Sequence, residues 1–97
     1  MKGKSNYDLE DDDDVAIVNV DFSGFIPINV TIPQGGTVTW MAVNGYNVQV
    51  VEDGATPYFS SPDPLTTYSF TFNSVGVWHY HNSHNISQTG TVTVIPK

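Results

Sequence analysis

From residue 15 onward, short runs of alternating apolar and polar residues follow one another, separated by Gly, Pro, Asn and Asp. Such alternation is typical of strands with one buried face, and no window of about eleven residues has the period of a helix. We expect strands over residues 15–22, 25–32, 37–41, 47–51, 68–72, 77–81 and 90–95. Strands at this spacing predict an all-β fold, a Greek-key β-sandwich of about seven to eight strands.

The same alternation predicts which side chains form the core. On the strand over 77–81, Trp78 and Tyr80 share one face, so His79 and His81 share the other. Because large aromatic side chains are usually buried, we expect the histidines to point outward. The neighbouring strands offer three more pairs to this core: Val38 and Trp40, Phe70 and Phe72, and Val92 and Val94.

Charge is concentrated near the amino end of the chain. The formal net charge is −7, and six of the ten carboxylates lie within the run YDLEDDDD at residues 7–14. Like charges repel and cannot pack, so we expect residues 1–14 to be an acidic, disordered arm and residues 15–97 to form the domain. Only three Lys and Arg residues are present, which argues against nucleic acid as a partner. A basic protein partner, or solubility alone, fits the charge better.

The chain contains no cysteine, so it forms no disulfide and has no thiolate to offer a metal. No apolar run approaches the length of about 20 residues that a membrane-spanning helix needs. We also find no signal peptide, although a signal or an anchor could have preceded the present first residue.

Two segments carry a resemblance to a known family. Residues 25–40, FIPINVTIPQGGTVTW, combine an alternating strand, a Gly turn and a second strand, and residues 68–94 end in an aromatic strand, a loop and the strand GTVTV. The step Phe59-Ser60-Ser61 lies between them. This pattern resembles the cupredoxin family, which includes plastocyanin and amicyanin. The resemblance implies a cupredoxin-like fold and a lineage of copper binding and electron transfer.

The residues at the family's copper-ligand positions differ from those of the family. Counted back from Gly90, the resemblance places Asn82 at the cysteine, Asn85 at a histidine and Gln88 at the methionine. Tyr46, in GYNV, stands where the first histidine is expected. A blue copper centre depends on a thiolate with two imidazoles, so this composition excludes a blue site. Among the four positions, only Gln88 is a plausible copper ligand.

Three histidines lie close together and suggest a different metal site. His79, His81 and His84 form the spacing H-x-H-x-x-H, and imidazole suits Cu(II) and Zn(II). A weak, non-blue type 2 copper site could use His79, His81, His84 and Gln88. Alternatively, the histidines are ordinary surface residues and no cofactor is bound. In that case Asn82, Asn85, Gln88 and Tyr46 could form a packed polar cluster where the metal would lie.

The sequence shows no nucleophile elbow and no phosphate-binding Gly loop, so we do not expect an enzyme. Three functions stay open: a cupredoxin-lineage protein with a non-blue metal site or none, a metal-free interaction module, and a deliberately altered scaffold. The last two would use residues 43–47 and 82–88 as the contact surface. We expect a monomer with a redox or other protein partner. The family resemblance suggests a periplasmic, extracellular or cell-surface location.

Overall fold

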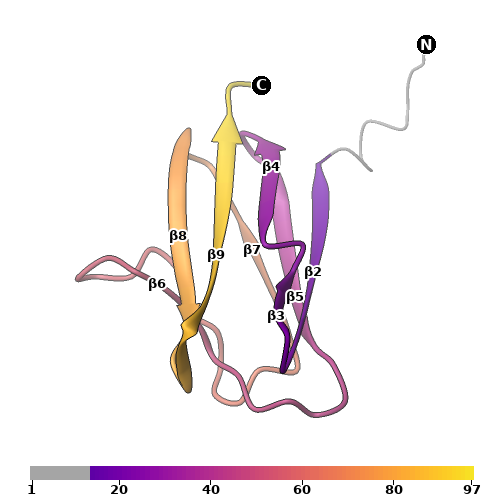
Figure 1. Cartoon of the computed structure of the whole chain (residues 1–97). Helices are drawn as coiled ribbons and strands as arrows, with labels where there is room; N and C mark the ends of the chain where they lie inside the picture. The colour runs from indigo at the N-terminus through magenta and orange to yellow at the C-terminus, as the bar shows by residue number, and fades with distance from the viewer. Residues whose placement is uncertain (1–13) are drawn as a thin grey trace.

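A computed structural model describes residues 14–97, and these form eight strands in two facing sheets (Figure 1). The all-β sandwich predicted from the alternating runs is confirmed. The strands are β2 (Val15–Asp21), β3 (Gly24–Ile26), β4 (Asn29–Pro33), β5 (Thr37–Ala42), β6 (Val50–Glu52), β7 (Thr67–Thr71), β8 (Gly76–Asn82) and β9 (Asn85–Ile95). No helix long and apolar enough to cross a membrane occurs among the described residues.

Each sheet contains four strands. The first has the order β3-β2-β5-β7 and the second the order β4-β9-β8-β6. The pairs β2/β5 and β4/β9 are parallel, and the other neighbours are antiparallel. The chain crosses between the sheets repeatedly, first between β3 and β4, so each sheet contains strands from both halves of the sequence.

The core lies between the sheets and has the predicted composition. Tyr80, Trp40 and Phe72 are fully buried, and Trp40 stacks on Phe59 with ring centroids 5.2 Å apart. Such aromatic pairs stabilise a core by about 0.5–1.5 kcal/mol beyond the area that they bury. Trp78 is only half-buried and stacks on the exposed Tyr58 at the edge of the core. The outer face of β8 carries His79 and His81, as the alternation predicted.

The predicted strand over 25–32 is two strands. β3 pairs with β2 in one sheet and β4 pairs with β9 in the other, with Pro27 and Ile28 between them. Proline has no N–H to donate to a ladder, so a strand does not continue regularly through Pro27. The predicted strand over 47–51 was also misplaced, because regular pairing there covers only Val50–Glu52.

The loop predicted between the strands over 77–81 and 90–95 was wrong, because most of this segment is strand. β8 ends at Asn82 and β9 begins at Asn85, which leaves Ser83 and His84 as a two-residue connection. A register shift between His81 and Asn82 accommodates the extra residues of β9. The segment therefore forms the tip of a long β8–β9 hairpin.

The acidic arm predicted over residues 1–14 lies outside the described residues, apart from Asp14. The Asp14 backbone oxygen accepts a hydrogen bond from the Thr37 N–H, and its carboxylate lies 3.3 Å from the Lys97 ammonium nitrogen. Both contacts are at the end of the sandwich opposite the β8–β9 hairpin tip, where Figure 1 also places the C-terminus.

Candidate functional site

The candidate site lies at the tip of the β8–β9 hairpin, beside the connection from β5 to β6. Alternation along β8 turns Asn82 to the same side as Tyr80, and its side chain is fully buried. Gln88 on β9 is buried as well, with 8% of its surface exposed. Two carboxamides are therefore enclosed at one end of the core, where a polar group without a partner would be costly.

Asn82 uses both ends of its carboxamide. Its Oδ1 accepts hydrogen bonds from the backbone N–H of Gln49 at 3.1 Å and of His84 at 3.0 Å. Its Nδ2 donates to Oε1 of Gln88 at 2.9 Å. The side chain thus connects the hairpin tip to the segment that leads into β6, and it caps the two-residue turn.

Gln88 extends the same network into the first sheet. Its Oε1 also accepts a hydrogen bond from the Tyr46 hydroxyl at 3.3 Å, and its Nε2 donates to the backbone oxygens of Asp21 and Phe22, both at 3.2 Å. Each buried polar atom of Asn82 and Gln88 therefore has a partner. We call the hydrogen-bonded set Tyr46, Asn82 and Gln88 the amide cluster.

The structure brings together three of the four residues that the resemblance placed at ligand positions. The fourth, Asn85, is exposed at the start of β9. Its Oδ1 accepts hydrogen bonds from the Ser87 hydroxyl at 2.7 Å and from the Ser87 N–H at 3.3 Å. Asn85 shapes the hairpin tip locally and makes no hydrogen bond to the amide cluster.

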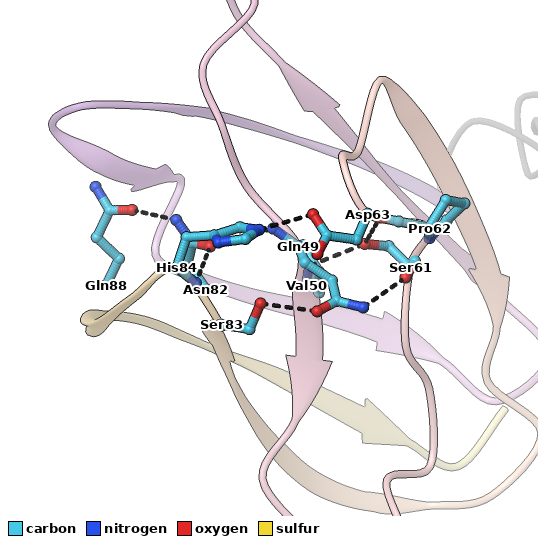
Figure 2. A network of polar contacts seen from close by, with 9 residues as sticks. All are labelled: Gln49, Val50, Ser61, Pro62, Asp63, Asn82, Ser83, His84 and Gln88. Carbon is cyan, nitrogen blue, oxygen red and sulfur yellow. Dashed lines mark hydrogen bonds and ion pairs between the residues drawn. The ribbon is translucent and has the colours of Figure 1, made fainter.

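A second set of polar contacts lies beside Asn82 and links the hairpin tip to Gln49 and Ser61 (Figure 2). The Gln49 carboxamide accepts a hydrogen bond from the Ser83 hydroxyl at 2.7 Å and donates to the Ser61 backbone oxygen at 3.2 Å. The buried Ser61 hydroxyl accepts from the Val50 N–H at 2.9 Å. Sequence reasoning missed Gln49, because an isolated polar residue near a strand carries no pattern that identifies it. Ser61 was noted only as part of the step Phe59-Ser60-Ser61, without a role in this network.

The three histidines have separate partners instead of converging. His79 Nδ1 lies 3.2 Å from the Thr91 hydroxyl, and His81 Nδ1 lies 2.7 Å from an Asp53 carboxylate oxygen. His84 uses Nε2, which lies 2.7 Å from an Asp63 oxygen. Within residues 14–97, no group of three or more His, Cys, Asp or Glu side chains is arranged to hold a metal ion.

The amide cluster does not fit a blue copper ion. It offers carboxamides and a phenol where such a centre needs a thiolate and two imidazoles. Nδ2 of Asn82 and Nε2 of Gln88 point their N–H groups at oxygen acceptors and have no lone pair to give a metal. Oε1 of Gln88, the one predicted ligand atom in the cluster, already accepts two hydrogen bonds.

The chain is similar to solved cupredoxin structures over most of its length. A purple cupredoxin from Nitrosopumilus maritimus superposes with a TM-score of 0.73 at 26% identity, over 82% of this chain and 99% of that chain. A methionine-to-glutamine mutant of amicyanin in its Cu(I) form gives 0.74 at 23% identity, over 86% and 84%. A copper-containing nitrite reductase from Thermus scotoductus SA-01 gives 0.73 at 23% identity, over 84% of this chain but 22% of that chain.

No protein-family model and no curated protein matches the sequence significantly. The structural matches show that the chain has the cupredoxin fold, which confirms the fold that the resemblance implied. The chain has no cysteine at any position, so it has this fold without the thiolate ligand.

Proposed function

We propose that this chain is a non-catalytic binding domain with a cupredoxin fold, which works without a blue copper centre. Its contact surface would be the loop end, defined as residues 43–47 and 82–88. The observation that carries the proposal is the saturated hydrogen bonding of Asn82 and Gln88. These side chains connect the hairpin tip to the β5–β6 connection and to the end of β2, so that no metal is needed to fix the loops.

A fixed loop end suits binding, because a preorganised surface loses less conformational entropy when a partner docks. The surface is also rich in groups that a protein partner could cover. Ile86, at the hairpin tip, is 76% exposed, and Phe22, which lies outside the loop end but accepts a hydrogen bond from Gln88 through its backbone oxygen, is 83% exposed. Contiguous apolar patches on a polar surface often mark interaction sites, and these two side chains are where such a patch could form when a partner docks. We therefore propose a protein partner at this surface. The family resemblance leads us to propose a periplasmic, extracellular or cell-surface location.

The proposal is tested by comparing the protein with and without metal. After chelation with EDTA, we expect an unchanged melting temperature and an unchanged amide NMR spectrum. The backbone N–H groups of Gln49 and His84, which donate to Asn82, should exchange slowly with solvent in this metal-free state. Addition of one equivalent of Cu(II) or Cu(I) should leave the side-chain amide signals of Asn82 and Gln88 in place. Stoichiometric copper binding that shifts these signals and raises the melting temperature would overturn the proposal.

A second function is favoured by one observation on the outer face of β8. His79 and His81 share this face, and each has Nδ1 engaged, by Thr91 and Asp53 respectively, so that Nε2 is available. A carboxylate on the second ring nitrogen is the usual way to orient a metal-binding histidine. Two imidazoles could hold Cu(II) or Zn(II) weakly in a non-blue, type 2 site, to which we assign no electron transfer. His84 and Gln88 are directed elsewhere by Asp63 and by the amide cluster.

A Cu(II) titration followed by electron paramagnetic resonance tests this second function. We expect a weak type 2 signal in the unaltered protein, its loss in the His79→Ala/His81→Ala variant, and its retention in the His84→Ala variant. A signal that survives the double substitution would place the copper elsewhere. A signal that requires His84 would support the larger histidine site predicted from the sequence spacing.

A further inference from the structure

A hollow of about 280 Å³ opens beside the amide cluster, between the turn that joins β2 to β3 and the first half of β9. Its apolar walls are Phe22, Phe25 and Ile28, and Asn85, Ser87 and Thr89 line the β9 side. No charged side chain lines it. β3 and this part of β9 lie side by side in the fold (Figure 1). The hollow is thus an uncharged recess with one wall made of strand.

That strand wall has an unpaired edge. The Thr91 N–H donates to the Ile28 oxygen at 2.9 Å. From Asn29 onward β4 pairs in parallel with β9, beginning at Thr91. On the amino-terminal side of Ile28, Pro27 has no N–H to donate, and the residues before it belong to β3 in the other sheet. Backbone groups in a strand alternate sides, so Thr89 directs its N–H and C=O to the same edge as Thr91. Among residues 14–97, no strand pairs with the segment of β9 before Thr91 on this edge.

Natural proteins usually protect such an edge with a charge or a proline. The segment from Asn85 to Gly90, NISQTG, has neither. Instead, the exposed side chains of Phe22 and Ile28, with 83% and 55% of their surfaces exposed, flank the mouth of the hollow. A strand edge without charge or proline, beside a recess with both apolar and polar walls, is an arrangement by which domains can bind an extended peptide as an added strand.

We propose that the edge of β9 at Thr89 binds an extended segment of a partner protein as an additional strand, with one apolar side chain of that segment in the hollow between Phe22 and Ile28. This inference rests on the proposed binding function and specifies the kind of segment that the partner protein offers. The negative charge of this domain indicates which residues flank the apolar residue in the partner segment. The described residues carry five carboxylates and one lysine, and Asp21 directly precedes Phe22. The partner segment is therefore basic on either side of its apolar residue, and a second acidic copy of this chain is disfavoured.

The test is an amide NMR titration with capped five-residue peptides of the form Lys-Thr-X-Thr-Lys, where X is Val, Ile, Leu or Phe. At least one peptide should shift the signals of Thr89, Ser23 and Ile28. N-methylation of its three central residues should weaken binding about tenfold, because the backbone donors are lost. Replacing both Lys by Glu should weaken binding in low salt. Phe22→Ser and Ile28→Ser should weaken it too, and the matched control Val77→Ser, which changes a 55% exposed residue on the outer face of β8, should not.

Several results would overturn this inference. These are no shift with any of the four peptides, equal binding of the N-methylated peptide, or shifts confined to another edge such as β6. Concentration-dependent dimerisation with the same shifts in the absence of peptide would show that a second copy occupies the edge. All of these results leave the metal-free binding function standing, because that function fails only in the copper titration of the amide cluster.

Discussion

The ring of Tyr80 lies directly against the backbone of Gly90, its cross-strand partner on β9. A Cβ atom built on Gly90 would stand 2.3 Å from the Tyr80 hydroxyl oxygen and 2.4 Å from the ring carbon that carries it. Both residues are buried, so neither can move into solvent. This contact explains why a glycine must precede the alternating segment TVTV. It is also the glycine from which the ligand positions of the family resemblance were counted.

Gly90→Ala is expected to lower the free energy of unfolding by about 1–3 kcal/mol, the usual cost of forcing extra atoms into a packed core. Urea denaturation followed by tryptophan fluorescence measures the change. Replacing Tyr80 by Leu removes the clashing atoms, so the double variant Gly90→Ala/Tyr80→Leu should lose less stability than the sum of the two single variants. An additive double variant would show that the contact with Tyr80 is not the reason for the glycine.

The alternating pattern predicted the sandwich and its core correctly, because burial of every second side chain is a local property of a strand. The tip of the β8–β9 hairpin was mispredicted for a physical reason. Residues 85–89, NISQT, alternate weakly, and among them only Asn85 and Thr89 have partners on β8. Pairing between distant segments leaves little trace in a short polar run. The hydrogen bond between Asn82 and Gln88 is equally invisible in sequence, although the resemblance placed both residues at one site.

Asn82→Asp tests whether the amide cluster needs a donor at its centre. Nδ2 of Asn82 donates to Gln88 Oε1, and an ionised carboxylate would place two acceptors face to face. We expect a loss of about 3 kcal/mol or more in the free energy of unfolding at neutral pH, since the buried charge would have no cationic partner and one of its oxygens would face the Gln88 acceptor. Burial favours the neutral carboxyl, whose folded-state pKa is raised, so the loss should grow as pH rises and shrink in acid.

Asn85→Asp is the matched control for this substitution. Asn85 is exposed and accepts hydrogen bonds only from Ser87, which a carboxylate can also accept. Its effect on the free energy of unfolding should stay within about 0.5 kcal/mol, as for most surface changes. Thermal denaturation of both variants at several pH values compares them. Equal effects of the two substitutions would contradict the distinction drawn between the buried amide cluster and the hairpin tip.

Alkaline pH is expected to destabilise the protein through Tyr80. Desolvation by burial raises the pKa of Tyr80 to about 12, from the ordinary value of 10.0. Because the folded-state pKa is the higher one, the resulting stability is fully present below pH 10 and is lost as pH rises from 10 towards 12. The loss should reach about 2–3 kcal/mol. Tyrosinate absorbance and circular dichroism should therefore change together, and Tyr80→Phe should shift the unfolding transition to higher pH.

The last prediction ranks the members of the amide cluster. Tyr46 donates to Gln88 over 3.3 Å, a long bond, and Gln88 Oε1 keeps Asn82 as a donor if Tyr46 is removed. Tyr46→Phe should therefore cost no more than about 1 kcal/mol in the free energy of unfolding. Gln88→Ala removes the acceptor of Asn82 and the donors to Asp21 and Phe22, and it leaves a cavity, so it should cost about 2–4 kcal/mol. Urea denaturation should therefore show a larger loss in the free energy of unfolding for Gln88→Ala than for Tyr46→Phe. The reverse order would mean that the phenol, and not the pair of buried carboxamides, holds the loop end together.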